Sequence, residues 1–193
     1  MEAPVEFGLY RFWRARLWER VATLPGTVLE IGAGTGRNFR YHPNRPVLAV
    51  DISPKMLAKA RSRRRPETRL AMMDAQRLAL PQGSIDIAVG TFVFCSIPDP
   101  IAGLRELRRA LAPGGRLFLL EHVLLNWWPA RPLMNALNPL VRWLTGANIN
   151  RDTEENVREA GFRVLEVEVY IFGLFKRIEA SAPPRLSRAE PAQ

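Results

Sequence analysis

A glycine-dense loop after a short apolar run constrains the fold of this chain most. Residues 27–36 read TVLEIGAGTG, so a strand expected over residues 27–31 leads into three glycines at alternate positions. Glycine allows tight turns with positive φ and lets a ligand approach the backbone closely. A dinucleotide-binding G-x-G-x-x-G fingerprint would need glycine at position 37, where Arg37 stands. The spacing is instead E-x-G-x-G-x-G, beginning at Glu30.

An acidic residue at the end of the next apolar run supports a nucleoside-binding role for this loop. Residues 47–50 are apolar and lead to Asp51, about 20 residues after Glu30. A βαβ unit places a carboxylate there, at the tip of its second strand, where it can accept hydrogen bonds from both ribose hydroxyls. The loop alone could be an ordinary strand-to-helix turn. Together with Asp51 it favours an adenosine cofactor.

The loop, Asp51 and residues 111–117 (LAPGGRL) resemble the class I S-adenosylmethionine (SAM) methyltransferases. The resemblance implies SAM as cofactor and S-adenosylhomocysteine as product. It also implies an α/β fold, with a Rossmann-like seven-stranded sheet that is mostly parallel, an antiparallel C-terminal hairpin and an N-terminal amphipathic helix. Methyl transfer from SAM is an in-line displacement, so it depends on alignment and exclusion of water and does not require a dedicated acid–base pair.

The expected cofactor residues follow from a ligand seated beyond the carboxyl ends of the strands. The glycine loop approaches the methionyl part of the cofactor, and further side chains surround the nucleoside. The full set is Glu30, Gly32, Ala33, Gly34, Thr35 and Gly36 in and before the loop; Asp51 on the ribose; Ile52 and Met56 over the adenine; Asp74 and Ala75 at its edge; and Thr91, Phe92 and Val93 at the reacting end.

Strand-like and helix-like segments alternate along the chain, which predicts a parallel sheet with right-handed crossovers. Ser53-Pro54 predicts a helix N-cap followed by proline at the first helical position. The expected strands cover residues 27–31, 47–51, 68–72, 85–89 and 116–123, and the expected helices cover 37–41, 53–64 and 99–111.

Three regions are predicted along the chain. Residues 1–25 form an N-terminal helix that acts as a membrane or substrate lid, and residues 26–179 form the methyltransferase domain. Within the domain, residues 124–161 form an insertion with leucines at helical spacing and Pro139, followed by a helix that begins near Asp152. Strands over 164–170 and 172–178 then form a hairpin around a glycine, and the tail, 180–193, is expected to be disordered.

The N-terminal helix, expected over residues 6–24, is apolar nearly all round but contains arginines. One aspect carries Phe7 and Trp18 flanked by Arg11 and Arg14, a combination that suits the headgroup region of an anionic bilayer. The alternative is a core helix with a solvated basic edge.

The charge and composition of the chain limit the kinds of partner and the cellular compartment that we expect for it. The formal net charge of +9 favours an anionic partner, either nucleic acid, an acidic membrane or a phosphorylated substrate. A single cysteine and two histidines exclude an internal disulfide and make a metal site unexpected. Without a secretory signal or a membrane-spanning run, the chain is expected to be a cytoplasmic monomer, associated peripherally with the inner face of the cell membrane.

Within this family, the chain resembles the bacterial phospholipid N-methyltransferases of the ubiquinone-methyltransferase-like type. The resemblance rests on the stretches 94–100, 120–123, 137–140, 146–151 and 155–157. That resemblance implies conversion of phosphatidylethanolamine through mono- and dimethyl forms toward phosphatidylcholine, and it implies an anionic membrane surface and a phospholipid as partners. Some of these stretches also recur in methyltransferases of lipophilic thiols.

An amine substrate must lose a proton before it attacks, because its pKa is about 10. Glu121, His122, Tyr170 or water is the expected proton acceptor, and aromatic faces favour the growing ammonium cation. Structural alternatives are a hydrogen-bonded strand end for His122 and helix capping for the asparagines. The candidates are Tyr10, Glu121, His122 and Tyr170 for catalysis, and Phe94, Trp128, Asn148, Asn150 and Arg151 for substrate binding.

Three rival functions stay open. A quinone precursor or a lipophilic thiol would suit the same fold. A nucleic-acid methyltransferase is suggested by the charge but disfavoured, because residues 91–94 (TFVF) do not form a D/N-P-P-Y/F motif, so no nucleic-acid partner is expected. A non-catalytic SAM-binding protein is disfavoured by the intact loop and Asp51.

Overall fold

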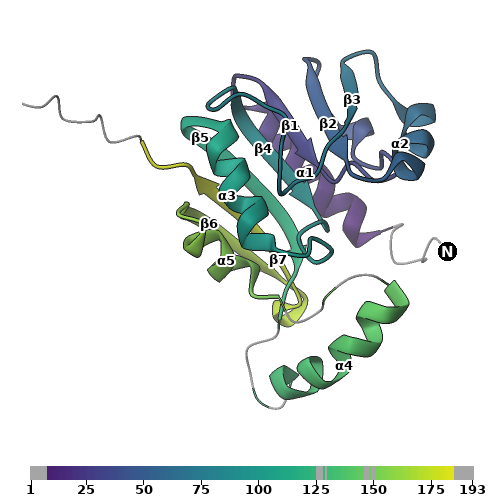
Figure 1. The fold of residues 1–193 in the computed structure, drawn as a ribbon, viewed down its shortest axis with the longest axis vertical. Coiled ribbons are helices and arrows are strands. Elements are labelled where there is room, and N and C mark those ends of the chain that lie inside the picture. The colour runs from purple at the N-terminus through teal and green to yellow at the C-terminus, as the bar shows by residue number, and fades with distance from the viewer. Residues whose placement is uncertain (1–7, 125–127, 129, 146–147, 149–150, 185–193) are drawn as a thin grey trace, which may run out of the picture.

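A seven-stranded sheet with helices on both faces forms the body of the protein (Figure 1). The structure is a computed structural model, and it describes residues 8–124, 128, 130–145, 148 and 151–184. The strands are β1 (Val28–Ile31), β2 (Val47–Asp51), β3 (Thr68–Met72), β4 (Ile85–Thr91), β5 (Leu111–His122), β6 (Arg163–Tyr170) and β7 (Phe175–Ser181). The helices are α1 (Leu9–Ala22), α2 (Pro54–Ala60), α3 (Pro100–Ala110), α4 (Ala130–Thr145) and α5 (Thr153–Glu159), with 3₁₀ turns at Phe39–Tyr41, Arg61–Arg63 and Ile171–Gly173.

The strand order is β3-β2-β1-β4-β5-β7-β6. Strands β1 to β5 are parallel to one another, whereas β7 runs antiparallel to both β5 and β6. The expected class I methyltransferase fold is therefore confirmed. Because β1 pairs with both β2 and β4, the order reverses at β1 and β4, and ligands of open α/β sheets bind beyond the carboxyl ends of the strands at such a point.

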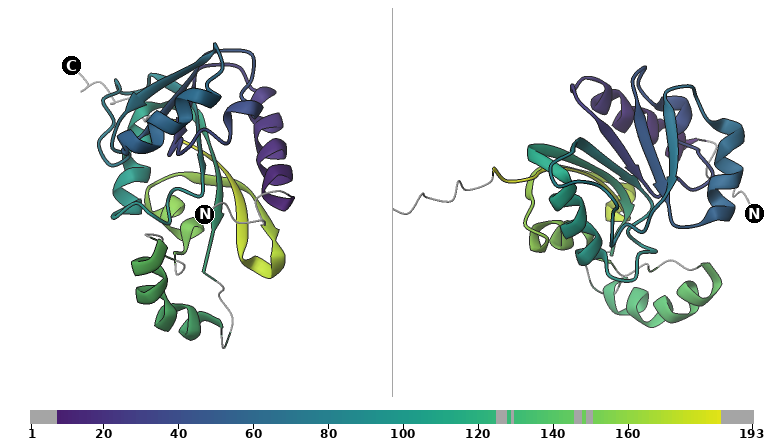
Figure 2. Two further views of the ribbon diagram at one scale, coloured as in Figure 1. Left: turned by 90° about the vertical axis from the view of Figure 1, so that its right-hand side faces the viewer. Right: turned by 45° about the horizontal axis from the view of Figure 1, so that its top comes forward.

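Alternation along the strands separates two hydrophobic clusters, one on each face of the sheet. Leu117 and Leu119 of β5 pack in one cluster with side chains of α3 and α5. Phe118 and Leu120 point the other way and pack in a second cluster with Trp13 and other residues of α1. Figure 2 shows the resulting layers, in which α1 lies across the sheet from α3 and α5.

Side-chain caps place three helices where the sequence predicts them. The Ser53 hydroxyl accepts a hydrogen bond from the Met56 N–H at 3.3 Å, ahead of Pro54 in the first turn of α2. Asp99 and Asp152 cap α3 and α5 in the same way. Such caps satisfy N–H groups that the helix itself leaves without partners.

Two expected boundaries at the C-terminal end are wrong. The hairpin turn is longer than expected, so the last strand begins at Phe175 and not at residue 172. That strand continues to Ser181, because its antiparallel pairing with β5 extends to Arg116, and Ala182 beyond it is buried. The predicted disorder from residue 180 is therefore wrong for residues 180–182. Residues 185–193 lie outside the described residues.

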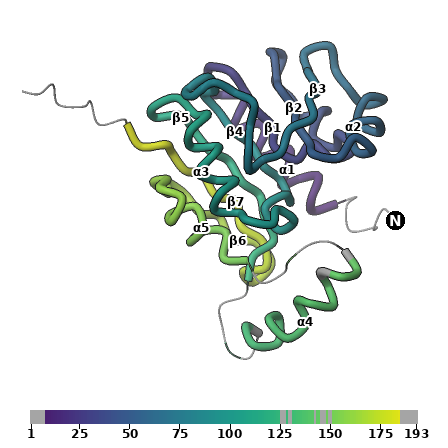
Figure 3. Tube along the Cα trace, viewed as in Figure 1, coloured from purple at the N-terminus to yellow at the C-terminus, as the bar shows by residue number. Residues whose placement is uncertain are grey.

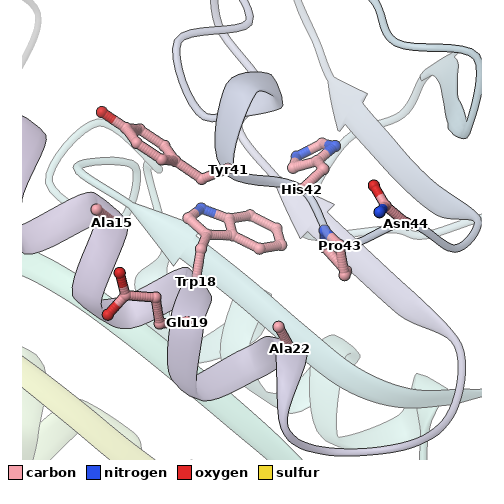
Figure 4. Close-up of a pocket in the computed structure, with 8 residues that line it drawn as sticks. All are labelled: Ala15, Trp18, Glu19, Ala22, Tyr41, His42, Pro43 and Asn44. Atoms are coloured by element: carbon pink, nitrogen blue, oxygen red, sulfur yellow. The ribbon is translucent and has the colours of Figure 1, made fainter.

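The membrane-facing aspect predicted for the N-terminal helix is wrong in two of its four residues. Trp18 is only 1% exposed and packs on the ring of His42, with centroids 4.6 Å apart. Figure 4 shows Trp18 lying between α1 and the Tyr41–Asn44 segment. Arg14 is 8% exposed because it turns inward to polar partners. Arg11 is exposed, and Phe7 lies outside the described residues.

The insertion after β5 forms one long amphipathic helix, α4, that contains Pro139 and stands apart from the sheet in Figures 1 and 3. Its two connections meet the domain close together, since the Leu124 N–H donates to the Arg151 carbonyl at 2.9 Å. The expected helix is therefore confirmed. Within the described residues, no helix is both long and apolar enough to cross a bilayer.

Candidate active site

The glycine loop adopts the backbone geometry that its sequence predicts. Gly32, Gly34 and Gly36 have φ values of 67°, 53° and 77°. A Cβ at Gly32 would lie 2.3 Å from the Val93 side chain, so glycine allows this loop to pack against the segment after β4. A Cβ at Gly34 would meet only the Gly32 carbonyl, at 3.9 Å, so the opposite side of the loop is open to a ligand.

Asp51 connects the glycine loop with the segment that follows β2. Its Oδ2 accepts a hydrogen bond from the Gly34 N–H at 2.8 Å, and its Oδ1 accepts one from the Ser53 N–H at 2.8 Å. A carboxylate has about four lone-pair sites, so each oxygen can accept a further hydrogen bond. The side chain is partly exposed at the edge of a cleft, as ribose binding requires.

That cleft, of about 240 Å³, lies at the carboxyl ends of the strands beside the glycine loop. Six of the predicted cofactor residues line it, which are Gly32, Asp51, Ile52, Asp74, Ala75 and Val93. The sequence analysis missed Gln76, although it directly follows Asp74-Ala75, and it missed Ser96, Ile97 and Pro98 from the loop before α3. The residues present fit an adenosine cofactor, because two acidic acceptors, Asp51 and Asp74, line an otherwise mostly apolar cleft.

Other predicted cofactor residues lie outside this lining. Ala33, Thr35 and Gly36 belong to the loop but not to the cleft wall, and Met56 is exposed on α2. Thr91 is buried, and its hydroxyl accepts hydrogen bonds from Arg14 and Asn38. Contact of these residues with the cofactor stays a prediction.

A buried polar network beneath the glycine loop ties it to α1. Glu30 accepts hydrogen bonds from the Asn38 amide at 2.6 Å and, on its other oxygen, from the His42 Nε2 at 2.9 Å. Arg14 donates to the Asn38 Oδ1 at 2.7 Å. Burial lowers the pKa of Arg14, and nearby Glu30 opposes that shift. Glu30 therefore anchors the loop from below, as predicted, and α1 takes part in the same network.

The segment after β4 is held by Glu121 at the end of β5. Glu121 is fully buried, and its Oε1 accepts hydrogen bonds from the Val93 N–H at 2.9 Å and the Phe94 N–H at 3.1 Å. Its Oε2 has no hydrogen-bond partner among the described residues. Burial raises the pKa of this carboxyl to about 7, although the backbone N–H groups oppose the shift. Glu121 thus positions Val93, which lines the cleft.

The raised pKa of Glu121 predicts that the protein loses stability as the pH rises. Between the ordinary pKa of 4.5 and about 7, the folded state binds more protons than the unfolded chain, so the free energy of unfolding falls. Glu121→Gln removes the titration but keeps an acceptor for both N–H groups. We expect the variant to lose roughly 5 °C less in melting temperature than wild type between about pH 5 and pH 7.5. Calorimetry, with Glu155→Gln on the surface as control, tests this, and parallel curves would contradict it.

An aromatic cluster lies next to the same segment, formed by Tyr10 and Trp13 of α1 with Phe92, Tyr170 and Phe175. The Tyr10 ring lies 5.1 Å from the Phe92 ring, and Trp13 stacks on Tyr170 at 4.8 Å. Phe92 has φ of 56°, a strained conformation for a residue with a side chain, and it directly precedes Val93 of the cleft. The cluster is therefore connected to the wall of the cleft through the Phe92–Val93 backbone.

His122 lies at the edge of this aromatic cluster. Its ring packs edge-on against Phe175, with centroids 5.2 Å apart and planes at 90°. Burial lowers the pKa of His122, so the imidazole is neutral near pH 7. Its Nδ1 is buried and has no hydrogen-bond partner among the described residues. The alternative expectation for His122, a structural role as a hydrogen-bonded residue at the strand end, is therefore not what the described residues show.

Two other titratable groups near the cluster are unsuited to accepting a proton. The Tyr170 hydroxyl donates to Glu168, and burial together with that carboxylate raises its pKa to about 12. Burial, followed by the charge of Glu121, raises the pKa of the Cys95 thiol to about 12. Both groups stay protonated near pH 7, so Glu121, His122 and water remain the expected proton acceptors.

The residues predicted to bind substrate are not gathered in one place. Phe94 is buried in the core on the α3 side, so its prediction as a substrate-facing ring is wrong. The Asn148 side chain donates to the Cys95 carbonyl at 3.0 Å, and Arg151 donates to the carbonyls of Ile97 and Pro98. Both hold the loop beside the cleft, while Trp128 is exposed. Their contact with substrate stays a prediction, and Asn150 lies outside the described residues.

Known proteins resemble this chain in sequence. A family model described as a methyltransferase domain matches residues 29–119. Thiol S-methyltransferase TMT1B of Rattus norvegicus is 30% identical over 175 residues, covering 80% of this chain and 69% of that protein. A demethylmenaquinone methyltransferase of Beutenbergia cavernae is 30% identical over 164 residues, covering 80% and 68%. A phosphatidylethanolamine N-methyltransferase of Cereibacter sphaeroides is 31% identical over 130 residues, covering 64% of each.

Solved structures share the fold. A SAM-dependent methyltransferase from Mesorhizobium loti has a TM-score of 0.67 at 20% identity and covers 90% of this chain and 98% of its own. A Haemonchus contortus N-methyltransferase in complex with phosphomonomethylethanolamine and S-adenosylhomocysteine has a TM-score of 0.71 at 18% identity and covers 90% and 53%. With its glycine loop, Asp51 and nucleoside cleft, the chain belongs to the class I SAM-dependent methyltransferases.

Proposed function

We propose that the protein N-methylates phosphatidylethanolamine, through its mono- and dimethyl forms toward phosphatidylcholine, at the inner surface of the cell membrane. The observation that carries the proposal is the aromatic cluster with His122 at its edge, which is connected to the cofactor cleft through Phe92, the residue before Val93 of the cleft wall. An amine acceptor needs a proton acceptor before each methylation and a favourable surface for the cation afterwards. This arrangement offers both.

The cofactor would be held by the residues that line the cleft. Asp51 would accept the ribose hydroxyls, Asp74 would reach the adenine edge, and the open side of the loop at Gly34 would receive the methionyl part. When bound, SAM supplies an electrophilic methyl group to the lone pair of the acceptor. Buried Glu121 fixes the backbone of Val93 at this end of the cleft, so that the acceptor is aligned and not merely bound.

His122 would take the proton of the ammonium group. It is neutral near pH 7, because burial lowers its pKa, and it lies on the aromatic side of β5. Glu121 points to the opposite face of the strand, where it accepts hydrogen bonds from the Val93 and Phe94 N–H groups. Removal of the proton is needed in each round, because only the unprotonated amine carries a lone pair.

The aromatic cluster suits a cation that gains methyl groups. Methylation removes N–H donors and spreads the charge over a larger apolar surface, which favours aromatic faces over water. The ring of Phe92 already accepts one cation, since the Arg14 guanidinium carbon lies 5.0 Å from its centroid. Tyr10 and Phe175 flank the same ring.

Labelling of lipids in a bacterial host that lacks phosphatidylcholine tests the proposal. The host expresses this chain and receives radiolabelled methionine, and its lipids are separated by thin-layer chromatography. Label in mono-, di- or trimethylated phosphatidylethanolamine is expected. If the protein binds SAM but no phospholipid is labelled, the proposal fails, and purified protein should then be offered a lipophilic thiol and a demethylated quinone, the acceptors that the names of other relatives indicate.

A further inference from the structure

Large apolar side chains are exposed at one end of the molecule. Figures 1 and 2 place α4 and the β6–β7 turn together at this end. The exposed side chains are Leu133, Leu137, Leu140, Trp143 and Leu144 on α4, and Val169, Ile171 and Phe172 at the turn. Scattered exposed apolar residues are ordinary, but two such groups at one end indicate an interaction surface.

The exposed side of α4 is a continuous apolar stripe. Leu133, Leu137, Leu140 and Leu144 are spaced by four, three and four residues, which places them on one face of a helix, and they are 43–65% exposed. Residues 123–151, which contain α4, include three arginines and no acidic residue. A helix with an apolar stripe in a basic segment suits the interface of an anionic bilayer.

The β6–β7 turn presents a single aromatic ring to the outside. Phe172 is 96% exposed, the highest value among the exposed large apolar side chains. Ile171 and Phe172 both have positive φ, of 45° and 54°, which is unfavourable for residues with bulky side chains. The adjoining strand is fixed at its base, because Trp13 stacks on Tyr170. A strained turn on a rigid hairpin therefore holds an apolar tip in solvent.

We propose that the α4 stripe and the β6–β7 tip together form a docking surface for an anionic phospholipid bilayer. The α4 stripe would lie in the interfacial region, while Ile171 and Phe172 would insert beside it. The choice of a bilayer rests partly on the proposed lipid substrate, since a phospholipid headgroup must reach the cleft without leaving the membrane. Charge also favours it, because the net charge of +9 attracts anionic lipid but repels a second copy of the chain.

Vesicle binding tests this surface independently of catalysis. The vesicles contain equal parts of phosphatidylglycerol and phosphatidylcholine and no phosphatidylethanolamine, so no acceptor is present. Ile171→Asn with Phe172→Asn removes the apolar tip but keeps residues that tolerate positive φ. We expect this double variant, and separately Leu133→Gln with Leu140→Gln, to bind at least about tenfold more weakly than wild type in sedimentation assays.

Met72→Gln is the matched control, because Met72 is as exposed as Leu144 but lies on β3, the opposite edge strand of the sheet. All variants should bind SAM as wild type does, which excludes misfolding. Equal vesicle binding by wild type, both surface variants and the control would overturn the proposal. So would a wild-type dimer that the α4 variant dissociates in light scattering, since a second copy would then cover the stripe. Vesicle binding without lipid methylation would instead reject only the proposed function.

Discussion

Asp51→Asn is expected to weaken SAM binding by about a hundredfold or more. The carboxylate would lose charge-assisted hydrogen bonds to the ribose, each contributing about 1.5–3 kcal/mol. The substitution also perturbs the protein itself, because the Asp51 Oδ1 accepts a hydrogen bond from the Ser53 N–H and Oδ2 accepts one from the Gly34 N–H. An asparagine NH₂ group must face one of these donors, so either the Gly34 or the Ser53 hydrogen bond would be lost.

Isothermal titration with SAM and with S-adenosylhomocysteine measures this effect. Both ligands carry the same ribose, so both affinities should fall together. Asp152→Asn is a suitable control, because Asp152 caps α5 and asparagine is an equally good N-cap. If Asp51→Asn binds both ligands within threefold of wild type while remaining folded, Asp51 does not hold the ribose, and the assignment of the cleft must be revised.

The parts of the site that the sequence predicts are those formed by neighbouring residues. The glycine loop and Asp51 each end a strand, and parallel strands bring their carboxyl ends to one edge, so their proximity follows from order along the chain. The Arg14 network does not follow in this way. Arg14 and Thr91 are separated by 77 positions and meet only because α1 packs on β4 and β5.

The two amphipathic segments show why burial is harder to predict than helix formation. The N-terminal helix is apolar nearly all round, so its pattern does not reveal which side faces the sheet, and Trp18 proves to be buried against His42. Phe94 is similar, because a residue in a turn has no periodicity that assigns it to a face. The spacing of the leucines in α4 predicts the apolar stripe correctly, but only the structure shows that these leucines are exposed.

His122→Gln is expected to lower kcat for methylation by about 10²- to 10⁴-fold while SAM affinity stays unchanged, because it removes the proposed proton acceptor and nothing that lines the cofactor cleft. Glutamine occupies a similar volume beside Phe175, so the aromatic cluster should persist. In wild type, burial lowers the pKa of His122 below 6.5. The imidazole must be unprotonated to accept a proton from the amine. The rate should therefore fall as the pH drops through that lowered pKa.

The pH profile separates this role from a merely structural one. In Glu121→Gln the fall below pH 6.5 should remain, because the titrating imidazole is still present, whereas the residual activity of His122→Gln should lack it. Imidazole added to His122→Ala should restore part of kcat without changing the affinity for SAM. If instead Glu121→Gln shifts or abolishes the pH dependence near its pKa of about 7 and His122→Gln does not, the buried carboxyl accepts the proton. The acceptor amine would then have to reach the α3 side of β5, which requires the segment after β4 to move when substrate binds.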